Sequence, residues 1–146
     1  MIHTVESWLR ASPRAVAVVD ASADLAAMLA RLGDADVRDL WVVDAGGRYR
    51  GHVGLHALAR IVLAEHRPVR SRRSLVDRSA SALAGDLADA HVRPARLDEA
   101  IDAVIHRMLA DRLESLAVVD GEGRVIGEVG LVDLIAGARR GELDNL

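Results

Sequence analysis

The sequence predicts an α/β (α+β) protein built from two copies of a β-α-β-β-α unit. The main observation is an internal repeat: Leu40–Leu58 and Leu116–Leu134 are identical at 11 of 19 positions, with a constant offset of 76 residues and no gap. The segments before them share a helical pattern at the same offset. The length of 146 residues fits one domain or one repeated module, and such a chain buries roughly two-thirds of its unfolded surface.

Each repeat begins with a short strand and a helix. The strand candidates are Ala15–Val19 and His91–Ala95. In the helices, apolar residues recur at i, i+3, i+4 and i+7, which places them on one buried stripe. Ser22 and Asp98 are predicted to cap the two helix N-termini. The stripe consists of Leu25, Met28, Leu29 and Leu32 in the first repeat and of Ile101, Val104, Ile105 and Met108 in the second.

A β-hairpin and a second helix complete each repeat. The turns contain Asp and Gly, which favour tight connections because glycine adopts positive φ without steric cost. In the first repeat the strands are Leu40–Val43 and Arg50–Gly54, and the helix is Leu55–Leu63. In the second repeat they are Leu116–Val119, Val125–Gly130 and Leu131–Ala138.

The predicted domain boundaries follow the repeats. Residues 1–64 form repeat one together with an N-terminal helix at Thr4–Arg10. Residues 65–78 are an arginine-rich linker, because charge runs of this kind are usually solvated. Residues 79–140 form repeat two and open with a short helix at Ser79–Asp89, and residues 141–146 are a C-terminal tail.

The composition excludes several classes of function. All 19 basic residues are arginine, which excludes Schiff-base chemistry and a phosphate-loop lysine. The net charge of −3 argues against a nucleic-acid partner. The absence of cysteine excludes disulfides and fits a cytoplasmic location, and no apolar run is long enough to span a membrane. His52 and His56 lie across a strand–helix boundary, so no metal site is predicted. No catalytic motif is present, and the chain is predicted not to be an enzyme.

The two Val-Val-Asp-x-x-Gly-Arg-x-x-Gly-x-Val-x-x-x-x-Leu runs, each preceded by a strand and a helix, resemble the tandem CBS-domain pair, or Bateman module. The resemblance covers about Val16 to Ala138. It implies two CBS repeats packed about a pseudo-twofold axis, a homodimer, and an adenosine-type ligand between the repeats. AMP, ADP, ATP and S-adenosylmethionine are the effectors that it suggests, with no cofactor required. One hypothesis is that the chain is the detached cytoplasmic regulatory part of a membrane channel or transporter.

The resemblance also suggests which residues bind the ligand. The family pattern after the third strand is Ser or Thr, two residues, then Asp; the Asp accepts hydrogen bonds from the ribose, and the hydroxyl residue helps to hold phosphate. Only the second repeat keeps the carboxylate, as Asp133, and both repeats replace the hydroxyl residue with glycine. The predicted ligand-binding residues are Asp133, Gly130, Leu131, Val132, Val92, Ser115, Leu116 and Ala117.

The equivalent cleft of the first repeat is predicted to be degenerate. Ala57 stands where the carboxylate is expected, and Trp41 is interpreted as a core residue that fills volume. The residues of this cleft are Gly54, His56, Ala57, Trp41 and Val16. A hydrogen bond to a charged group contributes roughly 1.5–3 kcal/mol, so we expect the two clefts to differ by one to two orders of magnitude in affinity.

Two hypotheses therefore stand. In the first, the protein is a regulatory module that senses an adenosine nucleotide and shifts the state of an attached or partner protein. In the second, it is a structural dimerisation module whose clefts bind nothing, which the two missing hydroxyl residues and Ala57 favour.

Overall fold

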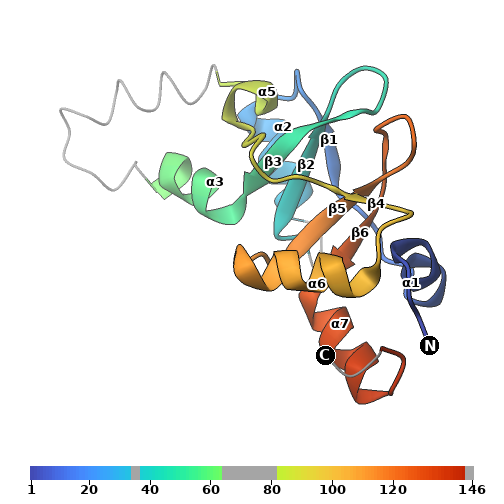
Figure 1. The fold of residues 1–146 in the computed structure, drawn as a ribbon. Coiled ribbons are helices and arrows are strands. Elements are labelled where there is room, and N and C mark those ends of the chain that lie inside the picture. Colours follow the sequence, from blue (N-terminus) through green and yellow to red (C-terminus); the bar gives the residue numbers. More distant parts are fainter. Residues whose placement is uncertain (34–36, 64–81, 144–146) are drawn as a thin grey trace. The chain divides into compact units, whose positions relative to one another are not determined.

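The computed structural model describes residues 1–33, 37–63 and 82–143, and the predicted linker at 65–78 lies outside them (Figure 1). The chain divides into two compact units. The central unit is Ala17–Val92, and the terminal unit joins Met1–Val16 to Arg93–Leu146. These units differ from the predicted domain boundaries, because the N-terminal segment belongs with the second repeat. The arrangement of the repeats about a twofold axis stays a prediction.

The central unit contains the first repeat. Its sheet has the order β1-β2-β3, in which β1 and β2 are parallel and β2 and β3 are antiparallel. The core lies between this sheet and its helices, with Met28, Leu40 and Leu58 fully buried. The elements are β1 (Val18–Asp20), α2 (Leu25–Leu32), β2 (Asp39–Val43), β3 (Tyr49–Gly54), α3 (Leu55–Val62) and α5 (Ala84–Leu87).

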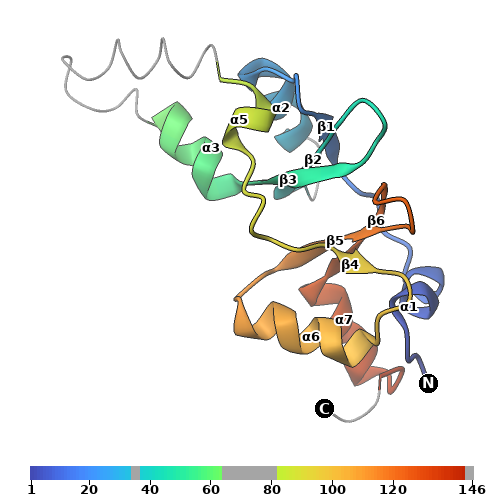
Figure 2. The same cartoon turned by 45° about the horizontal axis from the view of Figure 1, so that its top comes forward.

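The terminal unit contains the second repeat. Its sheet repeats the same topology, in the order β4-β5-β6. The helices α6 and α7 lie on the same side of this sheet (Figure 2). Its elements are α1 (Val5–Ala11), β4 (Ala95–Arg96), α6 (Ile101–Ala110), β5 (Ser115–Val119), β6 (Val125–Gly130) and α7 (Leu131–Arg139). The two three-stranded sheets and the mixed α/β class confirm the predicted fold.

The sequence repeat corresponds to a repeat in backbone geometry. Each hairpin has a register shift at the same place, between Val42 and Val43 and between Val118 and Val119. Asp44 and Asp120 close the two turns in the same way, since each carboxylate accepts two backbone N–H bonds of 2.9 and 3.0 Å. These bonds lower the pKa of both carboxyl groups.

The buried stripe predicted on the first helix of each repeat is fully confirmed only in the second. Ile101, Val104, Ile105 and Met108 are all buried on α6. On α2 only Met28 is buried, and Leu29 is 37% exposed. The first strands also start later than predicted, because Val18 and Ala95 are the first residues that pair with β2 and β5.

The two predicted N-caps are wrong. An N-cap residue must directly precede the first helical residue, and α2 and α6 begin too late for Ser22 and Asp98 to do so. Asp24 caps α2 instead, where its carboxylate accepts a 2.9 Å bond from the backbone N–H of Ala27. Ala100 precedes α6 and has no side-chain oxygen.

A short helix precedes each repeat in the chain and packs on the other one. The backbone N–H of Val5 in α1 donates to the carbonyl of Glu99, and that of Glu6 donates to Leu97. The equivalent bonds link α5 to the first repeat, from Ala84 to Ala23 and from Gly85 to Ala21. The four acceptors are related by the 76-residue offset of the repeats. Of the helix predicted at Ser79–Asp89, residues 79–81 lie outside the described residues, and within 82–89 the helix is α5, which contacts repeat one.

Candidate functional site

Asp133 lies in the first turn of α7, directly after strand β6. The helix begins after Gly130, which provides no side-chain cap, so this turn presents backbone N–H groups and one carboxylate. Gly130 pairs across the sheet with Ser115, the first residue of β5. The structure therefore brings together three of the predicted binding residues, Gly130, Asp133 and Ser115, at one end of the second sheet.

Arg14, which the sequence analysis did not identify as a site residue, lies at this end of the sheet. Its Nη1 donates to Asp133 Oδ2 at 2.9 Å, and its Nε donates to Glu128 Oε2 at 2.8 Å. Glu128 is a strand residue with a nearly buried side chain, whereas Arg14 and Asp133 remain 30% and 35% exposed. One guanidinium thus faces two carboxylates and leaves this trio with one net negative charge.

The charge state of Arg14 follows from these contacts. Burial acts to lower the pKa of its guanidinium, but the hydrogen bond to Asp133 and the charges of Glu128 and Asp133 outweigh burial and raise it. Arg14 is therefore a permanent cation in this site.

Gly130 makes room for the guanidinium. A Cβ atom built on Gly130 would lie 2.4 Å from Arg14 Nη1 and 3.1 Å from Asp133 Oδ2. Any larger residue here, including serine or threonine, would displace Arg14. The glycine that stands where the family pattern has a hydroxyl residue is thus matched by a cationic side chain that fills the same space.

The other predicted binding residues differ in accessibility. Leu116 and Ala117 are fully buried in β5, and Ser115 is 7% exposed. Val132 is 73% exposed, and Leu131 is half-buried. Val92 belongs to the central unit, where its carbonyl accepts a hydrogen bond from the Tyr49 hydroxyl. A role for Val92 beside Asp133 stays a prediction.

The equivalent end of the first sheet carries different chemistry. Gly54 pairs with Asp39, and His52 Nε2 lies 2.6 Å from Asp39 Oδ1. Trp41 packs beside His52, with ring centroids 4.9 Å apart, and it is 1% exposed. Ala57 places no carboxylate in the first turn of α3, and His56 is exposed there. Val16, also predicted for this cleft, belongs to the terminal unit.

A recess of about 230 Å³ lies at the opposite end of the second sheet, where β4 and β5 end. Arg96 Nε donates to Asp98 at 3.4 Å, and both side chains are well exposed. The Asp120 carboxylate is held by the backbone N–H groups of Glu122 and Arg124. The charged side chains of Arg96, Asp98 and Asp120 in this recess therefore each have a partner nearby in the sequence. The lining residues are Arg96, Leu97, Asp98, Val119, Asp120 and Gly121.

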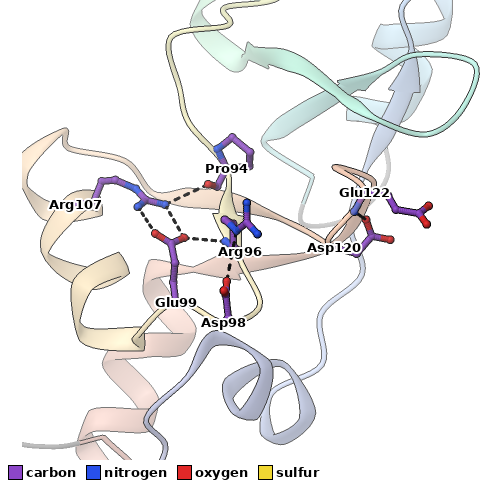
Figure 3. Close-up of polar contacts among 7 residues, drawn as sticks. All are labelled: Pro94, Arg96, Asp98, Glu99, Arg107, Asp120 and Glu122. Carbon is purple, nitrogen blue, oxygen red and sulfur yellow. Dashed lines mark hydrogen bonds and ion pairs between the residues drawn. The ribbon is translucent and has the colours of Figure 1, made fainter.

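An ion pair beside this recess fixes the segment that enters β4 (Figure 3). Arg107 Nη1 donates to Glu99 Oε1 at 2.8 Å, and Arg107 Nη2 also donates to the Pro94 carbonyl at 3.3 Å. Glu99 in turn accepts a 2.7 Å bond from the backbone N–H of Arg96. The hydrogen bond from Arg107 lowers the pKa of Glu99 despite partial burial. These contacts connect α6 to the chain on both sides of Ala95.

Within the described residues, no three His, Asp or Glu side chains come together as metal ligands. No helix in the same ranges has the length and apolar character needed to cross a membrane.

Comparison with known proteins agrees with this geometry. Residues 84–139 match the CBS domain family. No curated protein matches the chain. Many solved structures do, at identities that establish the fold alone.

Three of these structures illustrate the similarity. The crystal structure of CBSX2 in complex with AMP shares 20% identity, with a TM-score of 0.71 over 88% of this chain and 90% of that one. A CBS-domain containing protein from Agrobacterium tumefaciens shares 17% identity, with a TM-score of 0.71 over 94% and 95% of the two chains. The cytosolic domain of the Mg²⁺ channel MgtE, in complex with ATP, shares 21% identity, with a TM-score of 0.63 over 83% of this chain and 44% of that one.

Proposed function

We propose that this chain, whose second repeat matches the CBS domain and whose fold is that of CBS-domain pairs, is a regulatory module that binds an adenosine nucleotide at Asp133. The observation that carries the proposal is the Asp133 carboxylate at the start of α7, 35% exposed and beside the N–H groups of a helix start. The AMP and ATP in two of the similar structures support an adenosine ligand.

The roles of the residues follow from their positions. Asp133 accepts hydrogen bonds from the ribose hydroxyls, and Gly130 with the N-terminus of α7 faces the phosphate. Ser115 lies across the sheet from Gly130, at the end of the sheet where the nucleoside would bind. Leu116 and Ala117 are buried, so they support the strand from within the core. The first repeat lacks the carboxylate at Ala57 and contributes the weaker site.

The regulatory effect arises from differential binding. A ligand changes the state of an attached or partner protein only by its difference in affinity for the two states. The MgtE structure is the cytosolic domain of a Mg²⁺ channel, which supports a transport protein as the regulated partner.

We propose in addition that the module forms a homodimer through its second-repeat helices. Val132 and Ile135 on α7 are 73% and 58% exposed, and Leu109 on α6 is 58% exposed. Apolar side chains of this size on helix faces are typical of interaction surfaces. Light scattering of the chain and of Val132→Asp tests this, with a monomeric variant as the expected result.

The decisive experiment is a titration with AMP, ADP, ATP and S-adenosylmethionine, followed by calorimetry and thermal unfolding. A ligand at about 100 times its Kd stabilises the protein by about 2.7 kcal/mol. Asp133→Asn is expected to weaken binding about 10- to 100-fold, because it removes a charged acceptor. Asp102→Asn is the matched control, since Asp102 lies in the first turn of α6.

The alternative, a structural module with no ligand, has one specific observation in its favour. Arg14 already binds Asp133, so the carboxylate is satisfied within the chain. This alternative predicts that none of the four compounds raises the unfolding temperature, and that Asp133→Asn changes stability alone.

A further inference from the structure

We propose that Arg14 determines how many phosphates the Asp133 site accepts, and that it selects an adenosine ligand with a single phosphate. This inference rests on the proposed function, because it assigns the ligand class of the same site. It concerns three side chains of the terminal unit, Arg14, Glu128 and Asp133.

The Arg14 guanidinium occupies the space of the hydroxyl side chain that position 130 lacks. The space that a side chain on Gly130 would need is filled by the Arg14 guanidinium, 2.4 Å from a Cβ built on that glycine. A hydroxyl side chain there would offer one O–H donor, whereas a guanidinium offers five N–H donors and a positive charge. Arg14 is therefore positioned to bind an anion at the start of α7.

Arg14 also retains donors for a ligand. Nε is used by Glu128 and one hydrogen of Nη1 by Asp133. Among the described residues, Nη2 makes no hydrogen bond. Because Glu128 holds Nε and is nearly buried, the guanidinium stays in place when ribose hydroxyls take over Asp133. Nη1 and Nη2 can then bind one phosphate together, in the paired geometry that arginine favours.

The charge balance limits the ligand to a small anion. Arg14 is the one cation of the trio, while Glu128 and Asp133 are both acidic. The first phosphate gains the contact with Arg14. Arg140 is a further cation whose charge also interacts with Asp133, but it already forms an ion pair with Glu142. Each further phosphate therefore meets two carboxylates, and this second cation is already paired. The site should therefore favour AMP over adenosine, which lacks the phosphate, and over ATP, which carries excess charge.

The rival interpretation is that Arg14 only competes with the ligand for Asp133. Both interpretations predict a changed affinity when Arg14 is replaced, but in opposite directions for AMP. A phosphate-binding arginine gives weaker AMP binding in Arg14→Gln. A competing arginine gives tighter binding of AMP and of adenosine alike.

The experiment measures Kd by calorimetry for adenosine, AMP and ATP with the full chain and its variants. In the natural chain we expect AMP to bind about 10- to 100-fold more tightly than adenosine. Arg14→Gln should reduce this ratio to near one, and Arg14→Lys should restore part of it, because lysine keeps the charge but not the paired geometry. Glu128→Gln should raise the affinity for ATP relative to that for AMP by about 3- to 10-fold, because it removes one negative charge that repels phosphate.

Arg10→Gln is the matched control, because Arg10 is an exposed arginine of α1 that pairs with Glu6. It changes the net charge by the same amount and should leave all three affinities unchanged. Thermal unfolding verifies that each variant is folded, and the Arg14→Gln/Glu128→Gln double variant removes both members of the Arg14–Glu128 ion pair together.

The outcomes separate the two proposals. Suppose that AMP binding depends on Asp133 but that Arg14→Gln still binds AMP more tightly than adenosine by the same ratio. The role proposed for Arg14 is then wrong, and the proposed function stands. Tighter AMP binding in Arg14→Gln also overturns the inference. If neither the natural chain nor any variant binds an adenosine compound, both proposals fail.

Discussion

The two repeats have the same backbone but different polar chemistry at the end of the third strand. His52 in the first repeat pairs with Asp39 of the neighbouring strand, so its partner comes from the same hairpin. Its counterpart Glu128 pairs with Arg14, which lies 114 residues away in sequence. His52 is therefore paired within its own hairpin, whereas Glu128 is paired with a distant segment and has Asp133 beside it.

This difference shows where a duplicated fold can diverge. The register shifts and the strand order are the same in both repeats, and Asp44 and Asp120 make the same backbone bonds in the two turns. Positions 41, 52 and 57 and their counterparts differ without altering the backbone. The fold depends on the shared positions, and the chemistry depends on the others.

The largest expected effect concerns Trp41, the buried aromatic residue of β2 in the first repeat. Trp41→Ala gives the first repeat the residue that the second has at Ala117. Because Trp41 is 1% exposed and packs against His52, we expect a loss of about 3–5 kcal/mol in the free energy of unfolding. Urea denaturation measures this loss. A cost below about 1 kcal/mol would show that Trp41 does not fill the core.

The second prediction compares two equivalent glycines. A Cβ on Gly51 would lie 2.8 Å from Ala88 Cβ and 3.0 Å from the Asp89 carbonyl oxygen, so backbone has to move. A Cβ on Gly127 would meet the flexible end of Leu9 at 3.1 Å. We expect Gly51→Ala to cost about 1–3 kcal/mol and Gly127→Ala less than about 1 kcal/mol. Thermal unfolding of both variants checks the order, and equal costs would contradict it.

The smallest expected effect concerns pH. Glu99 has no counterpart in the first repeat, where Ala23 stands. The hydrogen bond from Arg107 lowers the pKa of Glu99 below its ordinary 4.5, so this contact stabilises the fold at neutral pH and is lost as the pH falls through the lowered value. Glu99→Gln should cost about 1–2 kcal/mol at pH 7 and progressively less below about pH 4.

Urea denaturation of Glu99→Gln and the natural chain at several pH values measures this convergence. Asp98→Asn, which removes the charge of an exposed neighbouring carboxylate, is the control for the loss of one acidic side chain. A difference that is the same at pH 7 and pH 3 would contradict the assignment.

Much of the fold follows from the sequence because its signals are local. The hairpins, their turns and the second helices lie within two residues of their predicted ends, since glycine and aspartate mark the turns directly. The N-cap of α2 was predicted wrongly because Ser22 and Asp24 are both favourable N-cap residues. Only the position at which α2 begins decides between them.

The site was predictable only in part. Asp133 and Gly130 could be placed by comparing the repeats, because they lie within the repeated segment. Arg14 lies outside it and is 119 residues from Asp133, so no spacing relates the two. The one available signal was the unexplained glycine at position 130, which indicates that another group needs its space. Contacts between distant segments have no periodic pattern, and the packing of α1 on the second repeat was missed for this reason.

The exchange of the helices α1 and α5 between the repeats has a consequence for synthesis. The central unit, Ala17–Val92, is one continuous stretch and can fold while the ribosome is still making the second repeat. The terminal unit cannot, because Met1–Val16 must wait for strands and helices that appear only after residue 93. The Ile2 N–H, for example, donates to the carbonyl of Glu142, which lies beyond the last helix of the second repeat. Arg14 and Asp133 therefore meet only after the second repeat has been synthesised.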